Sequence, residues 1–214
     1  MPKAKKLPPE QGRKSLYVAR NRAKIIKATQ QLLGEQGHAT TIEEVAERSE
    51  MAASSIYKHF ATKEDLFNTA IASGFSEWQS WASEFASKYE TDIEKLVIPM
   101  RLIVRVKQSH PIYAKLIGQN PDAVNALRFE VNKQLKAHLS KMQKSNSINL
   151  PDLDLRFLNL VAVLSSTLLK TISDDKFTTK QAEKSIMIAL QMVGLPEEVT
   201  LPIFSVPLDF ENLT

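Results

Sequence analysis

Apolar residues recur close to the helical period along most of the chain, which predicts helices that each bury one face. The first helix spans about residues 15–36, and Gly37 follows it as a natural C-cap because glycine adopts a left-handed backbone at low cost. Its apolar positions are Val18, Ile25, Ile26, Leu32 and Leu33. We therefore expect a long N-terminal helix that ends in a tight turn.

Capping signals divide the next stretch into two short helices and one long helix. Thr41 and Glu44 have the spacing of a capping box, in which each side chain satisfies the other residue's backbone amide. Thr62 precedes acidic residues in a similar way and should begin the long helix. The predicted helices cover residues 41–49, 52–59 and 62–89.

The C-terminal part is predicted to be helical as well, over residues 92–108, 111–118, 121–143, 152–172 and 178–194. Pro99 should kink the first of these helices because proline lacks a backbone donor, whereas Pro121 suits a first helical position. Capping signals for the last two helices are Asp152 or Asp154, and Thr178 with Gln181. Residues 195–214 contain three prolines and no helical period, so we expect an extended tail.

The predicted fold is therefore all-α, with a three-helix N-terminal unit and a C-terminal helical bundle. The low glycine count, 6 in 214 residues, agrees with helices rather than with a turn-rich β protein. We divide the chain into an arm (1–14), the N-terminal unit (15–70) and the bundle (71–214).

Basic charge is concentrated at the N-terminus. Residues 1–27 hold 9 Lys or Arg against 1 acidic residue, whereas residues 71–214 hold 16 of each sign. A flexible basic arm suits a polyanion such as DNA. The competing interpretation is a tail that only keeps the protein in solution.

Several classes of protein are disfavoured by the composition. The chain has no cysteine, which excludes disulfides and thiolate chemistry. No apolar segment follows the basic N-terminus as in a signal peptide, and the most apolar stretch, residues 158–169, is interrupted by polar side chains. We expect a cytoplasmic prokaryotic protein without a membrane span.

The sequence contains no recognisable catalytic or metal-binding pattern. The four histidines, at positions 38, 59, 110 and 138, are far apart and form no zinc-binding pair. No glycine-rich phosphate loop or nucleophile motif occurs. We therefore predict a non-enzyme that needs no cofactor and no metal.

Two short helices joined by a tight turn follow the helix-turn-helix plan, whose second helix enters the DNA major groove. The residues that sharpen this prediction lie in Thr40-Thr41-Ile42-Glu43-Glu44-Val45-Ala46-Glu47-Arg48, in Ser54-Ser55-Ile56-Tyr57-Lys58-His59-Phe60 and in Lys63-Glu64-Asp65-Leu66. This pattern, over about residues 20–70, resembles the TetR family of transcriptional regulators. The resemblance implies a homodimer that binds palindromic operator DNA, most often as a repressor, and releases it when a small molecule binds the bundle.

Two departures from the family pattern lie in the turn before the recognition helix. The family usually has Gly-Val-Ser there, whereas this chain has Glu50-Met51-Ala52. Without the Ser N-cap the helix should lose about 1 kcal/mol of stability. Glu50 should repel phosphates unless it points away from the DNA.

The resemblance and residue chemistry together give candidate DNA contacts. Ser54, Ser55 and Lys58 are expected at base edges, and Ala53 against a thymine methyl group. The candidates for contacts with DNA phosphates, through a side chain or a helix N-terminus, are Thr40, Thr41, Ala52, Tyr57, His59 and Lys63. Lys63 opposes the helix dipole in a first turn, which favours an external anion as its partner.

An aromatic stripe marks the candidate effector site. Trp78, Trp81 and Phe85 stand at i, i+3 and i+7 of the fourth helix, either as plain core or as the wall of a pocket. Leu102, Tyr113 and Phe129 could face the same pocket. Because few polar groups are available, we expect an apolar or aromatic effector.

The last two helices are apolar on more than one face, although a surface helix needs only one apolar stripe. A two-fold partner is the commonest cover for a second face. The predicted dimer residues are Val161, Leu164, Leu168, Ile186 and Leu190. Two alternatives stay open: an interaction module that has lost specific DNA binding, and a helical ligand-binding or enzymatic bundle.

Overall fold

The computed structural model describes the backbone of residues 10–208 and the side chains of residues 14–120 and 133–208. This part of the chain contains α-helices and one 3-10 helix, and no strand. The elements are α1 (Glu10–Gln36), η1 (Gly37–Ala39), α2 (Ile42–Ser49), α3 (Ala53–His59), α4 (Lys63–Ser87), α5 (Asp92–Ile103), α6 (Val106–Ser109), α7 (Pro111–Gln119), α8 (Pro121–Lys144), α9 (Leu153–Ser173), α10 (Thr179–Met192) and α11 (Glu197–Ser205).

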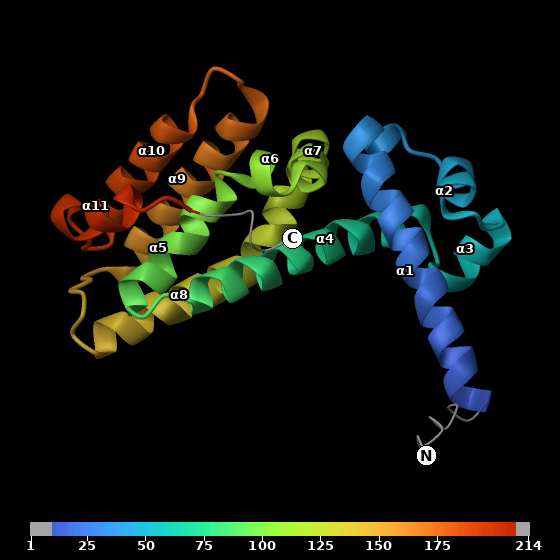
Figure 1. Ribbon diagram of the computed structural model, residues 1–214, viewed down its shortest axis with the longest axis horizontal. Coiled ribbons are helices and arrows are strands. Elements are labelled where there is room, and N and C mark those ends of the chain that lie inside the picture. Colours follow the sequence, from blue (N-terminus) through green and yellow to red (C-terminus); the bar gives the residue numbers. More distant parts are fainter. Residues whose placement is uncertain (1–9, 209–214) are drawn as a thin grey trace, which may run out of the picture.

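The helices form two groups that α4 connects (Figure 1). At one end α1, α2, α3 and the first turns of α4 surround one apolar core, which we call the head. Its central side chains, including Ile25, Leu33, Val45 and Leu66, are fully buried. At the other end the rest of α4 packs with α5 and α8–α11 in a second group, the bundle.

Helix α7 packs between the head and the bundle, and two glycines permit its close approach. A Cβ atom at Gly74 of α4 would lie 2.8 Å from a ring atom of Tyr113 on α7. A Cβ atom at Gly34 of α1 would lie 3.4 Å from the Ile112 carbonyl oxygen, also on α7. Leu116 of α7 is buried in the head core. A displacement of α7 would therefore change its packing against both α1 and α4.

The local predictions of helix starts are confirmed where a side chain makes the cap. Thr41 and Thr178 form complete capping boxes, and Thr62 accepts from the Asp65 amide. Asp152, in contrast, has φ of 56° and caps nothing with its side chain. Thr91 with Glu94 forms a third capping box, which was not among the predicted caps although its motif is present in the sequence.

Three predicted boundaries are wrong. Helix α1 begins at Glu10, so residues 10–14 are helical, while the remainder of the predicted arm lies outside the described residues. The predicted helix 92–108 divides at Val104 and Arg105, five residues beyond Pro99, and α5 continues through that proline. The predicted tail contains α11.

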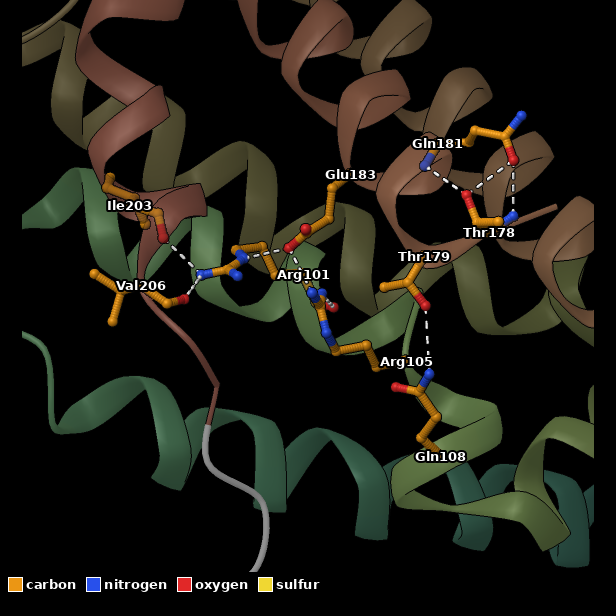
Figure 2. A network of polar contacts seen from close by, with 9 residues as sticks. All are labelled: Arg101, Arg105, Gln108, Thr178, Thr179, Gln181, Glu183, Ile203 and Val206. Atoms are coloured by element: carbon orange, nitrogen blue, oxygen red, sulfur yellow. Dashed lines mark hydrogen bonds and ion pairs between the residues drawn. The ribbon is translucent and has the colours of Figure 1, made fainter.

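Arg101 explains why α11 forms despite Pro202 in its sequence (Figure 2). Its guanidinium is 2% exposed and donates to the carbonyl oxygens of Ile203 and Val206, at 2.6 and 2.9 Å. Its Nε atom lies 2.6 Å from a carboxylate oxygen of Glu183, which also pairs with Arg105 at 2.7 Å. A buried cation thus satisfies the carbonyls at the end of α11, where the helix dipole is negative.

Helix α9 is the one element within residues 10–208 that is long and apolar enough to cross a membrane by length and composition, contrary to our reading of its polar interruptions. Such a helix is weak evidence for a span, because core helices of soluble proteins have the same composition. One face of α9 packs on α10 through buried residues such as Leu160. Leu155 and Leu158, on another face, are 63% and 62% exposed.

Candidate DNA interface and ligand cavity

The recognition helix α3 separates its core face from its exposed face. Ile56 is buried in the head, as is Phe60, which ends the helix. Ala52, Ser54, Tyr57 and Lys58 are exposed, whereas Ala53, Ser55 and His59 are half-buried. The exposed candidates Ser54, Tyr57 and Lys58 therefore share one side of a short helix that the head holds in place, and the half-buried candidates flank them.

The two threonines before α2 have different surroundings. Thr41 is exposed and forms the capping box with Glu44, whose amide donates to the Thr41 hydroxyl at 3.3 Å. Thr40 is fully buried, and its hydroxyl donates to the Gly37 carbonyl at 2.8 Å. The Thr40 side chain therefore holds the turn together and cannot reach a phosphate.

The turn before α3 keeps the geometry that a glycine would favour. Glu50 has φ of 56° and ψ of 40°, a left-handed conformation that costs a non-glycine residue free energy. Ala52 stands at the N-cap with an extended backbone but makes no capping hydrogen bond. Both departures from the family pattern therefore lower the stability of the turn without altering its path.

Basic side chains around α3 already have partners within the head. Lys24 lies 3.5 Å from the Glu50 carboxylate, and both groups are largely exposed. Arg22 lies over the Phe60 ring at 4.8 Å, and Lys63 over the Phe67 ring at 5.1 Å. Lys63 thus has a cation–π partner of its own, which weakens the inference that its position demands an external anion.

The first turns of α1 extend beyond the rest of the head (Figure 1). Residues 14–20 are all exposed, including Leu16, Tyr17 and Val18. Lys14 and Arg20 belong to this segment, and Arg22 and Lys24 follow it. The helix therefore presents basic groups on a rigid extension.

A cavity of about 480 Å³ lies in the bundle between α4, α5, α8 and α9. This volume falls within the range of small-molecule sites, about 300–1,000 Å³. The wall is mostly apolar, with Phe75, Trp78, Leu164 and Leu168 among its residues. Its polar members include Gln79, Lys95, Gln134, His138 and Ser165. No pattern in the sequence predicts these polar residues, because they come from four helices that only the tertiary fold brings together.

One of the predicted pocket residues, Trp78, lines this cavity. Phe85 and Leu102 are buried in the core beside it. Leu102 is fully inaccessible and Phe85 is 5% exposed, so both support the wall rather than form it. The side chain of Phe129 lies outside the described residues. Trp78 also carries a buried indole N–H that has no hydrogen-bond partner among the described residues of the chain.

Trp81 and Tyr113 belong to a separate aromatic cluster around His110. The Trp81 ring meets the His110 ring edge-on at 4.6 Å, and the Tyr113 ring stacks on it at 5.4 Å. The Tyr113 hydroxyl donates to Glu77. Burial is the main cause that raises the pKa of Tyr113, and burial lowers the pKa of His110.

The predicted dimer residues mostly face the protein's own core. Ile186 and Leu190 have no exposed surface, and Val161 and Leu168 are 9% and 8% exposed. Leu164 is half-buried and lines the cavity. The exposed apolar side chains of α9 and α10 are instead Leu155, Leu158, Ile188 and Met192. The outer apolar surface is therefore formed by other residues of the same two helices, two to six positions from the nearest predicted ones.

Comparison with known proteins agrees with this organisation. Residues 25–70 match the family model of bacterial regulatory proteins, tetR family. The chain is 30% identical over 113 residues to the HTH-type transcriptional regulator QacR of Staphylococcus aureus. That alignment covers 51% of this chain and 60% of QacR, less than two thirds of its length.

Two solved structures show the same fold over most of the chain. RolR in complex with resorcinol has a TM-score of 0.71 at 20% identity and covers 91% of this chain and 98% of its own. FadR of Bacillus subtilis in complex with stearoyl-CoA has a TM-score of 0.65 at 17% identity, with coverages of 80% and 97%. The helix-turn-helix region thus matches the family model over residues 25–70, and most of the chain shares its fold with these two structures. Over residues 25–70 the chain therefore resembles the bacterial regulatory proteins of the tetR family.

Proposed function

We propose that the protein is a cytoplasmic, ligand-responsive repressor that binds palindromic operator DNA as a homodimer. The observation that carries this proposal is the arrangement of α3, which buries Ile56 and exposes Ser54, Tyr57 and Lys58 on one side. Hydroxyl and amine groups on such a helix are suited to base edges and phosphates in the major groove.

The extended first helix would add affinity without reading sequence. Lys14 and Arg20 lie on its exposed part, and each phosphate contact of this kind releases counterions. Deletion of residues 1–14 should weaken binding to every duplex and reduce the slope of log K against log salt. An unchanged slope would assign the segment no role in binding DNA.

A dimer is required because one short recognition helix contacts too few base pairs to be specific. Two heads must lie about one helical turn of DNA apart, ~34 Å. The exposed side chains of Leu155, Leu158, Ile188 and Met192 offer an apolar face for a second copy. We propose this face of α9 and α10 as the two-fold interface, in place of the residues predicted from sequence.

The cavity supports regulation by a small molecule. Helix α4 begins in the head at Lys63 and lines the cavity with Phe75 and Trp78. A ligand could change the spacing of the two heads through α4, provided that it binds the two spacings with different affinity. The ligands bound to RolR and FadR show that this fold can hold small molecules of very different size.

Selection of bound sequences from random duplex DNA tests the proposal. A palindromic consensus with half-sites about one helical turn apart is expected. Absence of any specific sequence would favour the alternative, a helical ligand-binding or interaction module. The observation that favours this alternative is the turn before α3, where Ala52 provides no cap and Glu50 pairs with Lys24.

The interface is tested by Leu158→Glu, with Leu201→Glu on α11 as the matched control. Both leucines are exposed, at 62% and 49%. In sedimentation velocity Leu158→Glu should give a monomer that no longer binds the operator, whereas Leu201→Glu should stay dimeric and bind it. A Leu158→Glu dimer with intact operator binding would place the interface on another surface.

The roles within the head can be separated on the selected operator. Tyr57→Phe and Lys63→Ala should lower affinity about equally for all sequences, because phosphate contacts position the protein. Ser55→Ala and Lys58→Ala should change the preference at particular base pairs by about 1–3 kcal/mol. Identical behaviour of all four variants would contradict this division.

A further inference from the structure

We infer that the bundle cavity binds an elongated amphiphile with an anionic head group, oriented with its head against Lys95 and its apolar body against Phe75 and Trp78. This inference rests on the proposed ligand-responsive function, because it names the ligand class of the same cavity. It replaces the purely apolar effector that the sequence suggested.

The cavity is long in the direction of α4. Its wall includes residues of α4 from Phe75 to Ser87, which are twelve positions apart. At a rise of 1.5 Å per residue this stretch of helix measures about 18 Å. A compact ligand would contact one end of such a cavity, whereas an extended chain can contact both.

The two ends differ in chemistry. The end nearer the head has Phe75 and Trp78 of α4, Ile117 of α7 and Leu168 of α9 in its wall. The far end has Ser87 of α4, Lys95 of α5 and His138 of α8. Two contacts assign these residues to opposite ends of the cavity. At the end nearer the head, Gly118 of α7 lies against Ile172 in the C-terminal turn of α9. At the far end, His138 of α8 contacts Asp92, the first residue of α5.

Charge at the far end favours an anion. Lys95 is the one lysine among the described residues of the wall, which include no Asp or Glu. The Lys95 ammonium donates to the backbone carbonyl of Glu90 at 3.1 Å and forms no ion pair within the described part of the chain. A half-buried cation without a carboxylate partner, beside apolar walls, is stabilised by an anionic ligand.

His138 is held in position beside this lysine. Its Nε2 atom lies 2.8 Å from the Asp92 carbonyl oxygen, which can only accept, so Nε2 carries the proton. The Asp92 carboxylate is itself occupied by Lys141 at 3.0 Å. The Asp92 carboxylate is therefore paired with Lys141 rather than with Lys95, which acts on Asp92 and Glu94 only at longer range.

The test uses the full-length protein without DNA and three probes that share one chain and differ in head charge: decanoate, decanol and decyltrimethylammonium. Isothermal titration calorimetry below micellar concentrations should find decanoate binding about tenfold tighter than decanol, equal to about 1.4 kcal/mol, and the cation weakest. Lys95→Met keeps the aliphatic stem and should abolish the preference for decanoate. Lys88→Met, at an exposed lysine outside the wall, should retain it.

Fluorescence reports the position of the chain. In Trp81→Phe the remaining tryptophan is Trp78, whose emission should change when decanoate binds. In Trp78→Phe the remaining Trp81 lies outside the wall and should respond less.

Three results would overturn the inference: no binding of any probe, equal binding of all three, or a decanoate preference that survives Lys95→Met. Operator binding is measured separately on wild-type protein. A protein that prefers decanoate but selects no palindrome would refute the proposed repressor function and leave the ligand class standing. A protein that binds a palindrome but prefers the cationic probe would support the proposed repressor function and refute the anionic ligand class.

Discussion

The head and the bundle are stabilised by polar contacts of different reach along the chain. In the head, the caps of Thr41 and Thr62 join residues three positions apart, and the hydrogen bond from Gln30 to the Ala70 carbonyl oxygen spans 40 positions. In the bundle, Arg101 joins residues 82, 102 and 105 positions apart through Glu183, Ile203 and Val206. A change in the head should therefore act locally, whereas one change in the bundle should loosen elements that are distant in sequence.

The largest effect that would sharpen this comparison is expected for Arg101→Met. The variant leaves the Glu183 carboxylate with one partner fewer and two carbonyls without a donor, which should cost about 3–5 kcal/mol of unfolding free energy. Urea denaturation measures it. Lys107→Met, which removes an exposed ion pair with Asp175, is the control and should cost at most about 1 kcal/mol. Equal losses in the two variants would refute a special role for Arg101.

The turn before α3 should respond in the opposite direction. Glu50→Gly relieves a left-handed conformation at the expense of an exposed ion pair and should raise stability by about 1 kcal/mol. Thermal denaturation of the protein gives the sign. Glu47→Gly, inside α2, should lower stability by about 1 kcal/mol. The same Glu50 variant frees Lys24 and should strengthen binding to non-specific DNA, and weaker binding would mean that Glu50 positions Lys24 for its contact.

A smaller gain is expected from Ala52→Ser. The N-cap residue already has the extended backbone of a capped helix, so a hydroxyl there can accept an amide of the first turn. We expect an increase of a few tenths to about 1 kcal/mol in unfolding free energy. Ala61→Ser, at an exposed position where Thr62 already caps the next helix, should change nothing measurable.

These outcomes bear on what a single sequence can predict. The caps at Thr41, Thr62 and Thr178 were predicted because both partners stand within one turn of helix. Helix α11 was missed because its prolines and its lack of period are overcome by Arg101, from about a hundred positions away. The exposed leucines of α9 were missed for a similar reason: the sequence shows that two faces are apolar but not which face α10 covers.

The smallest expected effect concerns pH. Burial lowers the pKa of His110 below its ordinary value, so the unfolded chain binds a proton there more readily than the folded protein. The stability contributed by neutral His110 is therefore present above the ordinary histidine pKa, about 6.5, and is lost as pH falls toward the lower folded value. The midpoint temperature of thermal unfolding should therefore decrease as the pH is lowered below about 6.5.

The control for this prediction is His110→Gln, which removes the titrating group. Its slope of stability against pH below about 6.5 should be flatter than that of the wild type. Equal slopes would assign the acid sensitivity to other groups, since His38, His59 and His138 remain in the variant.

The contacts of Arg101 also have a consequence for the order of events during synthesis. The carbonyl oxygens of Ile203 and Val206 leave the ribosome roughly a hundred residues after Arg101, whose guanidinium donates to them. At about 5–20 residues per second this interval lasts about 5–20 s. During that time the head has all its local contacts, while the bundle has an ionic centre that cannot yet close. Nascent chains should therefore present a folded DNA-binding head before they present a finished regulatory bundle, and a chain truncated before α11 should be recognised by proteases as incomplete.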